Sequence, residues 1–397
     1  MLEAGAAYRC FCDPATLAER REKERQSGQT VAKDRCCANL SPEEIQAKID
    51  AGESYAVRLL IPDETITVDD GVHGEVNVNG SEIEDFILLR SNGTPTYMLA
   101  VVVDDADMRV THVIRGDDHL SNTPKQILLY RALGLTPPKF AHVPTILGSD
   151  KKKLSKRHGA TSITEYRDIG YLPETMVNYL GLLGWSTSDD REVISRDELI
   201  EMFDIPGINK SSAVFDDKKL NWLNGQYIGK LDYDDVRDQL VNLASEAVAE
   251  KILNRAPEEA DIHAAWNLFC NRIHLLPELF VWGDYIFQAP KDFDAKGVRK
   301  QFKADGAVEM LSEVADAFNK LTEFKADTVE NSIRELAEAK KINGGKLIHP
   351  VRLAVSGTTG GPGLFELLVA LGRDTVVARI QTAVKMIQSD SVPLKSK

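Results

Sequence analysis

The stretch Thr111-His112-Val113-Ile114-Arg115-Gly116-Asp117-Asp118-His119 decides the fold. Its short apolar run ends abruptly in charged residues, and a helical pattern follows from Pro124 to Leu133. A second apolar run follows at Ala141-His142-Val143-Pro144-Thr145-Ile146-Leu147. Buried strands that end in polar residues, with helices between them, are typical of a parallel α/β sheet, where ligands bind beyond the carboxyl ends of the strands. We therefore expect Arg115 and the segment Lys153 to Arg157 to line a ligand site.

The rest of the sequence extends this pattern on both sides. Residues 55–61 and 65–90 predict strands, and we interpret the apolar run Tyr97–Val103, which ends in Asp104-Asp105, as another buried strand. Residues 13–27 predict a charged helix with Asp13 as its N-cap. From residue 173 onward the sequence has a helical pattern of apolar residues. We expect helices at 177–183, at 197–203 and through most of 233–397.

Composition and charge limit the possible functions. The 397 residues suggest two to four domains. A formal net charge of -13 argues weakly against a nucleic-acid partner, but basic residues do cluster between Lys151 and Arg157. The sequence has neither an apolar stretch long enough for a membrane helix nor a secretory signal at its start, so we expect no membrane partner and a cytoplasmic location.

The strongest chemical signal is the basic loop Lys153-Leu154-Ser155-Lys156-Arg157. Two ammonium groups and a guanidinium around a small serine suit a triphosphate, whose charge must be stabilised when pyrophosphate departs. A solvated basic turn is the alternative interpretation.

The loop is similar to the KMSKS signature of class I aminoacyl-tRNA synthetases, and the chain as a whole resembles their glutamyl branch. The residues that carry the resemblance are Pro95-Thr96-Tyr97, Val102 to Asp105, Thr111 to Gly116, Asp118-His119-Leu120, Asn122-Thr123-Pro124, Asn178-Tyr179-Leu180, Gly184-Trp185, Val214-Phe215-Asp216, Lys219 to Gly225, Arg352 to Gly357 and Gly363 to Leu368. The resemblance implies a glutamate–tRNA ligase, which activates L-glutamate with ATP to glutamyl-AMP and transfers it to tRNA(Glu).

The resemblance also implies roles in the amino-acid pocket. Arg115 would pair with a carboxylate of glutamate, because a guanidinium fork suits that group. Tyr97 would shape the pocket through its hydroxyl group. The alternatives are a core aromatic for Tyr97 and, for Arg115, an ion pair with Asp117 or Asp118.

For ATP, the resemblance implies contacts from His119 and from the backbone around Ile146 and Leu147. Lys156 would contact the phosphates and stabilise the transition state of adenylate formation, with Lys153 and Ser155 in the same catalytic loop. Mg²⁺ is implied by ATP. A helix cap or packing role is the alternative for His119.

Four cysteines, Cys10, Cys12, Cys36 and Cys37, lie in the first tenth of the chain and suggest a tetrahedral Zn²⁺ site. Some glutamyl synthetases have Cys-x-Cys here, followed by a third Cys and a His two residues later. In this chain Ala38 occupies the His position. Cys37 would have to substitute, and the alternative is a relic of a lost site with free thiols.

The resemblance implies an α/β fold: a partial class I nucleotide-binding (Rossmann-like) fold with an acceptor-end insertion and an all-α C-terminal anticodon-binding region. The expected domains are residues 1–95 for the insertion with its Cys-rich start, 96–148 for the C-terminal half of the nucleotide-binding fold, 149–232 for the KMSKS-like loop and stem-contact region, and 233–397 for the helical anticodon-binding region. A monomer is the expected state.

The HIGH signature of class I synthetases is absent from this sequence. We therefore expect an N-terminally truncated enzyme that is inactive alone. One part of a split synthetase and a non-catalytic tRNA-binding paralogue are the alternatives. A third hypothesis is a metal hydrolase built from Asp104-Asp105, Asp117-Asp118 and nearby histidines, although their spacing matches no standard ligand motif.

Overall fold

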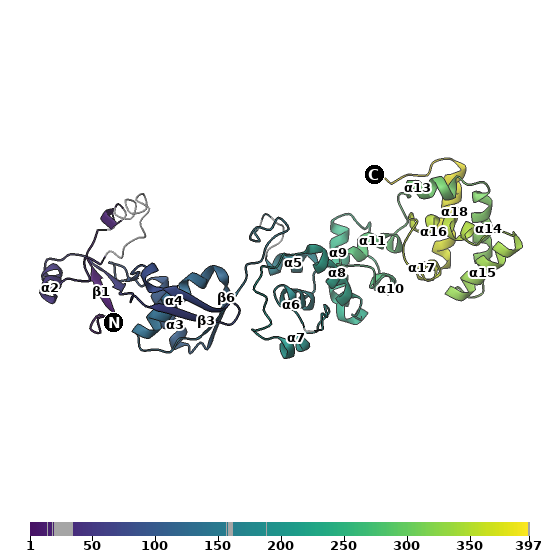
Figure 1. Ribbon diagram of the computed structural model, residues 1–397. Helices are drawn as coiled ribbons and strands as arrows, with labels where there is room; N and C mark the ends of the chain where they lie inside the picture. The colour runs from purple at the N-terminus through teal and green to yellow at the C-terminus, as the bar shows by residue number, and fades with distance from the viewer. Residues whose placement is uncertain are drawn as a thin grey trace. The chain divides into compact units, whose positions relative to one another are not determined.

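The computed structural model describes residues 1–13, 15–17, 19, 35–155, 157, 162–187 and 189–395. The chain, drawn in Figure 1, divides into two compact units. Unit 1 comprises Met1–His158 and Leu180–Phe215, and unit 2 comprises Gly159–Tyr179 and Asp216–Lys397.

A four-stranded sheet with the order β4-β3-β7-β6 organises unit 1. The strands are β3 (Thr65–Asp70), β4 (Gly74–Asn79), β6 (His112–Gly116) and β7 (Lys139–Val143). β3 and β4 form an antiparallel hairpin, whereas β7 pairs in parallel with both β3 and β6. The parallel strands expected around Arg115 and His142 are therefore confirmed. Polar residues at the carboxyl ends of three adjacent strands meet at one edge of the sheet.

The interpretation of Tyr97–Val103 as a strand is wrong, because this segment begins the helix α3 (Tyr97–Asp107). A seven-residue apolar run fits both a strand and one face of a helix. In the structure, Leu99, Val102 and Ala106 recur at helical spacing and pack on the core of unit 1, while Tyr97 and Val103 are exposed. The helix therefore brings Tyr97 to a surface.

Helix α4 (Thr123–Ala132) confirms the helix expected after the first strand. Seven of its ten residues are buried, and Leu129 packs with Ile66 and Val68 of β3 in the core of unit 1. Because α4 begins with Thr123 directly after a short 3₁₀ turn at Asp117–Asn122, its first turn faces the carboxyl end of β6.

A second, antiparallel sheet in unit 1 has the order β1-β2-β5, with β1 at Ala7–Cys10, β2 at Ala56–Leu59 and β5 at Ile87–Leu89. The helix α2 (Pro42–Asp50) lies between β1 and β2 in the chain. The Asp13 carboxylate accepts from the N–H groups of Ala15 and Thr16 at 3.0 and 3.2 Å, which fits the expected N-cap. Most of the predicted helix 13–27 lies outside the described residues.

The last part of unit 1 is a small cluster around Trp185, with Ile194, Leu199 and Ile208. It contains α7 (Arg196–Met202), which Ser195 and Glu198 begin with a reciprocal capping box. The helices expected at 197–203 and 177–183 are confirmed by α7 and by α6 (Pro173–Leu182).

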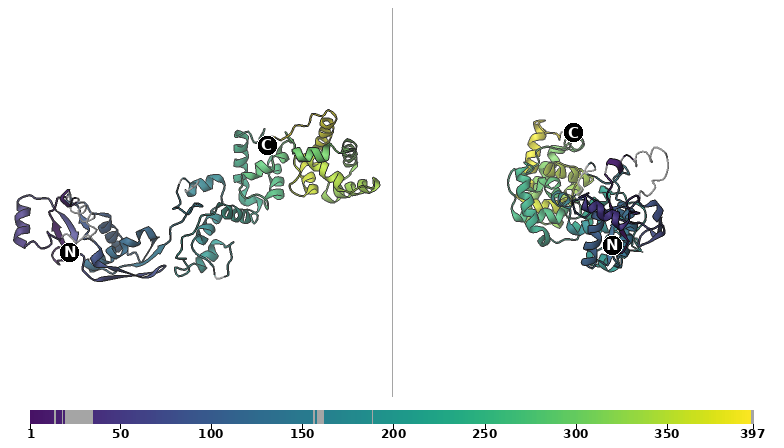
Figure 2. Two further views of the ribbon diagram at one scale, coloured as in Figure 1. Left: turned by 45° about the horizontal axis from the view of Figure 1, so that its top comes forward. Right: turned by 90° about the vertical axis from the view of Figure 1, so that its left-hand side faces the viewer.

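Unit 2 is helical in its described residues, as expected for residues 233–397. Its helices are α5 (Ile163–Ile169), the start of α6, α8 (Asp217–Ile228), α9 (Tyr233–Ala249), α10 (Glu259–Phe269), α11 (Glu278–Trp282), α12 (Asp284–Phe287), α13 (Ala295–Gly297), α14 (Ala307–Lys320), α15 (Ala326–Ala339), α16 (Gly345–Ser356), α17 (Leu364–Leu371) and α18 (Arg373–Gln388). α18 packs against α14 and α16, and Figure 2 shows these yellow-green helices from two further sides. In the described part of the chain, we find no helix long and apolar enough to cross a bilayer.

Candidate functional site

Arg115 lies at the carboxyl end of β6, with its guanidinium held from two sides. Nε donates to Nε2 of His142 at 3.1 Å. Nη2 donates to Oγ1 of Thr123 and to Oε1 of Gln126, both at 2.8 Å. Two of these partners come from α4 and one from β7, so two neighbouring elements fix the side chain that β6 presents. These three hydrogen bonds join Arg115 to neutral side chains. They are therefore not the ion pair with Asp117 or Asp118 that was the alternative interpretation.

Asp70 and His142 form a buried pair behind Arg115. The Asp70 carboxylate contacts Nδ1 of His142 at 2.5 Å, and both side chains are fully buried. Burial alone would raise the pKa of Asp70, but hydrogen bonds from the N–H groups of Val72 and His73 and from His142 lower it overall. Burial lowers the pKa of His142, and Asp70 opposes this shift. The geometry therefore favours an ionised aspartate beside a neutral histidine.

Tyr97 and His119 lie on the exposed side of Arg115. Their ring centroids are 6.3 Å apart, and Nη2 of Arg115 is 3.5 Å from the carbonyl oxygen of His119. Tyr97 is 53% exposed, which rules out the alternative of a core aromatic. Burial lowers the pKa of the Arg115 guanidinium, whereas Tyr97 and Asp105 act in the opposite direction. A half-buried cation thus lies beside a solvent-facing phenol.

The basic loop begins as a tight hairpin at the same end of the sheet. Leu147 pairs with Lys153 across the turn, and Leu147 also pairs with Val214, which anchors the hairpin. Nζ of Lys153 lies 3.2 Å from the Asp118 carboxylate, three residues after Arg115. Ser155 is exposed, while Lys156 lies outside the described residues.

The arrangement is suited to anionic ligands. It combines a fixed guanidinium, an exposed ammonium group that pairs with a surface carboxylate, and the Ile146 and Leu147 backbone beside them. The sequence did not point to Asp70, Thr123 or Gln126. Their signal was weak, because Asp70 is the second of two adjacent aspartates at the end of β3, and Thr123 and Gln126 lie beside Lys125 at the start of α4.

The metal-hydrolase hypothesis finds no matching geometry in the described part of the chain. Asp117 accepts a hydrogen bond from Thr145, Asp118 pairs with Lys153, and His142 is engaged with Asp70 and Arg115. The described residues that can group as metal ligands are instead the cysteines Cys10, Cys12 and Cys37.

The thiols of Cys10, Cys12 and Cys37 have sulfur atoms within 4.8 Å of one another. The Sγ atom of Cys36 is 3.1 Å from that of Cys12 and 3.8 Å from that of Cys37. An ion pair between Arg35 and the buried carboxylate of Asp85, at 2.9 Å, anchors the second cysteine pair. Thiolates arranged about 2.3 Å from a common centre would have similar separations, so the cluster fits a zinc ion.

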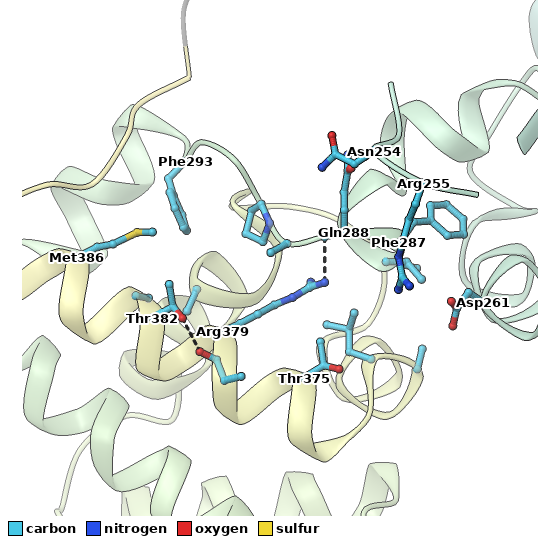
Figure 3. A pocket seen from close by; sticks show the side chains of 18 residues that line it. Asn254, Arg255, Asp261, Phe287, Gln288, Phe293, Thr375, Arg379, Thr382 and Met386 are labelled. Atoms are coloured by element: carbon cyan, nitrogen blue, oxygen red, sulfur yellow. Dashed lines mark hydrogen bonds between the residues drawn. The ribbon is translucent and has the colours of Figure 1, made fainter. Parts of the chain in front are cut away.

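Unit 2 contains a cavity of about 720 Å³ between the segment at Asn254 to Phe293 and helices α16 to α18. Figure 3 shows Arg379 reaching across it towards Gln288. The nearly buried guanidinium donates to the carbonyl oxygens of Tyr285, Val355 and Gln288 at 2.5, 2.7 and 2.9 Å. Because these carbonyls lie at the ends of α12 and α16, Arg379 acts as a shared cap for two helices.

Two family models match the chain. The catalytic domain of class I tRNA synthetases (E and Q) matches residues 1–222, and an anticodon-binding domain matches residues 239–384. The first match begins at residue 1 and does not support the expected truncation of the catalytic domain.

The chain is also similar to individual proteins over almost its whole length. It is 42% identical to a glutamate–tRNA ligase of Moorella thermoacetica, covering 98% of this chain and 80% of that protein. It is 42% identical to glutamate–tRNA ligase 1 of Syntrophomonas wolfei, covering 98% and 78%.

A solved structure agrees with these sequence relatives. The crystal structure of a glutamate tRNA ligase from Elizabethkingia meningosepticum, in complex with its amino acid, superposes with a TM-score of 0.85 at 30% identity and covers 96% of this chain and 80% of that one. A class I catalytic domain, an anticodon-binding domain and relatives of this similarity show that the chain belongs to the glutamate–tRNA ligase family of aminoacyl-tRNA synthetases.

Proposed function

We propose that the carboxyl end of the parallel sheet in unit 1 is where this ligase binds glutamate and ATP. The observation that carries the proposal is that Asp118, which pairs with Lys153 of the basic loop, lies three residues after Arg115. Arg115 and Tyr97 then bind glutamate, while His119, Ile146, Leu147 and the loop bind ATP.

In this proposal each group acts through position and charge. The guanidinium of Arg115 holds one glutamate carboxylate, so that the other carboxylate can attack the α-phosphate of ATP. Lys153, Ser155 and Lys156 stabilise the charge that builds on the phosphates as pyrophosphate leaves. Mg²⁺ enters as the ATP complex and neutralises phosphate charge.

Matched variants test this assignment in an assay of tRNA(Glu) glutamylation. Arg115→Lys is expected to weaken glutamate use at least tenfold, because an ammonium group replaces the fixed fork. Arg131→Lys, at an exposed arginine of the same unit, is the control. Lys153→Ala should weaken ATP use, with its neighbour Lys152→Ala as control. A chain that binds tRNA but forms no glutamyl-tRNA would favour the non-catalytic paralogue.

We also propose that the cysteine cluster binds one Zn²⁺. Cys10, Cys12 and Cys37 would supply three thiolates, and Cys36 is the nearest further thiol. Metal analysis of the purified protein should give about one zinc per chain. Cys37→Ser should lose most of it, whereas Cys270→Ser should keep it. A zinc content well below one in the unaltered protein would contradict the site.

We also propose the domain division expected from the sequence. Residues 1–95 would contact the acceptor end of tRNA and residues 233–397 its anticodon. The anticodon-domain match at residues 239–384 supports the second assignment.

We further infer a cytoplasmic monomer. Light scattering of the purified protein tests the oligomeric state, and a stable dimer mass would contradict it.

A further inference from the structure

Three neighbouring strands carry a buried hydrogen-bonded chain that ends at Arg115. Asp70 is the last residue of β3, His142 lies in β7, and Arg115 lies in β6 directly opposite His142 in the parallel register. The Asp70 carboxylate meets Nδ1 of His142 at 2.5 Å, and Nε2 of His142 meets Nε of Arg115 at 3.1 Å. The imidazole thus bridges an aspartate and an arginine that belong to different strands.

The partners of His142 fix its proton. A guanidinium can only donate hydrogen bonds, so Nε2 of His142 must accept from Arg115 and carry no proton itself. The proton then lies on Nδ1 and is donated to Asp70. Thr123 completes the arrangement, since its Oγ1 accepts from Nη2 of Arg115 at 2.8 Å and lies 3.0 Å from Nε2. His142 is therefore neutral, in a single tautomer.

Asp70 is anchored independently of the arginine. Its Oδ1 atom accepts from the N–H groups of Val72, His73 and His142 at 3.0, 2.9 and 3.2 Å. Its other oxygen is engaged by the His142 ring. Three backbone donors hold the Asp70 carboxylate in place. The fixed carboxylate orients the imidazole ring of His142, and the ring in turn orients the Nε edge of Arg115.

We propose that His142, held as the Nδ1–H tautomer by Asp70, is a positioning residue that fixes the Arg115 guanidinium for the glutamate carboxylate. This inference rests on the role proposed above for Arg115. A direct Asp–Arg ion pair would compete with the substrate for the guanidinium, whereas a neutral imidazole orients it and leaves its charge to the ligand. Nε and Nη2 of Arg115 are fixed by His142, Thr123 and Gln126, and none of these three partners carries a charge that would neutralise the guanidinium.

Equilibrium dialysis of the full chain with radiolabelled glutamate, and separately with ATP, tests the proposal without requiring turnover. His142→Leu and Asp70→Asn should weaken glutamate binding about tenfold and change ATP binding less than about twofold. His142→Gln should restore most of the glutamate affinity, because its amide oxygen can accept from Nε of Arg115. His112→Gln, at an exposed histidine of β6, is the control.

Nitrogen NMR of the unaltered protein with ¹⁵N-labelled histidine gives a second measurement that does not depend on any variant folding. His142 should show a protonated Nδ1 and an unprotonated Nε2 at neutral pH. A charged or mixed-tautomer His142 would overturn the proposal, as would variants that weaken glutamate and ATP binding equally.

Arg115→Lys separates failure of this inference from failure of the proposed function. If Arg115→Lys weakens glutamate binding and the His142 and Asp70 variants do not, the positioning role is wrong and the role of Arg115 stands. If Arg115→Lys leaves glutamate binding unchanged, or if the unaltered chain binds no glutamate, the proposed role of Arg115 fails and the inference fails with it.

Discussion

At the scale of single residues, Asp70 and His142 make the stability of unit 1 depend on pH. The pKa of His142 is lowered in the folded protein, so the unfolded chain takes up the proton first as the pH falls. The pKa of Asp70 is also lowered, so its stabilisation is present above the ordinary aspartate value and is lost as the pH falls through the folded one. Both lowered pKa values therefore make the folded protein less stable as the pH falls.

We accordingly expect the free energy of unfolding to decrease as the pH falls below about 6.5, the ordinary histidine value, and again below about 3.9, that of aspartate. The titratable groups facing His142 are Asp70, Arg115 and His73. Urea unfolding at pH 7.5, 6.0 and 5.0, followed by the part of the tryptophan fluorescence that is lost on replacing Trp185 by Phe, measures the first step. His142→Gln should lose less stability over this range than the unaltered protein, and parallel curves for the two proteins would contradict the assignment.

The candidate site was predictable where one residue carries its own chemical signal. Arg115 and the basic loop stood out because cations at strand ends are unusual in an apolar context. Asp70 did not stand out, because its function depends on β3 lying beside β7, a pairing between residues about 70 positions apart in the chain. His142 was visible as a polar residue in a strand, but its neutral state depends on two partners that only the fold supplies.

At the scale of elements, helix ends in unit 2 depend on one side chain. Arg379 of α18 is buried and satisfies carbonyl groups of Tyr285, Gln288 and Val355. Burial lowers the pKa of its guanidinium to about 10, which still leaves it charged at neutral pH. The side chain joins α12 to α16 without any carboxylate partner among these contacts.

Arg379→Met should therefore destabilise unit 2 by about 2–4 kcal/mol, because buried carbonyls lose their donors while the apolar packing is largely kept. Circular dichroism during urea unfolding measures the loss. Arg334→Met is the matched control on an exposed face of α15, where the arginine pairs with Glu330. An equal, small effect of both substitutions would show that the Arg379 contacts contribute little net stability.

The elements that sequence reasoning identified correctly are those with one dominant period. β3 alternates exposed and buried residues, and the long helices of unit 2 bury one face each. The strand prediction for Tyr97–Val103 was wrong because seven consecutive apolar residues show neither the period of a strand nor that of a helix. Tertiary packing of Leu99 and Val102 against the core decided for a helix.

At the scale of the whole molecule, each unit has its own hydrophobic core. The core of unit 1 includes Leu88 and Ile66, and that of unit 2 includes Leu240 and Phe280, with no residue common to both clusters. Domains with separate cores usually unfold as separate cooperative transitions. We therefore expect denaturant unfolding of the full chain to show two transitions.

One core substitution in each unit tests this expectation. Leu88→Ala and Leu240→Ala each remove a side chain that is at most 1% exposed, and each should cost about 2–5 kcal/mol in its own unit. Trp185 is the single tryptophan of unit 1, whereas Trp222, Trp266 and Trp282 belong to unit 2, so replacing Trp185 by Phe assigns the fluorescence of the unit 1 transition. Leu88→Ala should then lower only the unit 1 transition, which Trp185 reports, and Leu240→Ala only the unit 2 transition. A single transition that both substitutions shift equally would mean that the two cores unfold as one cooperative body.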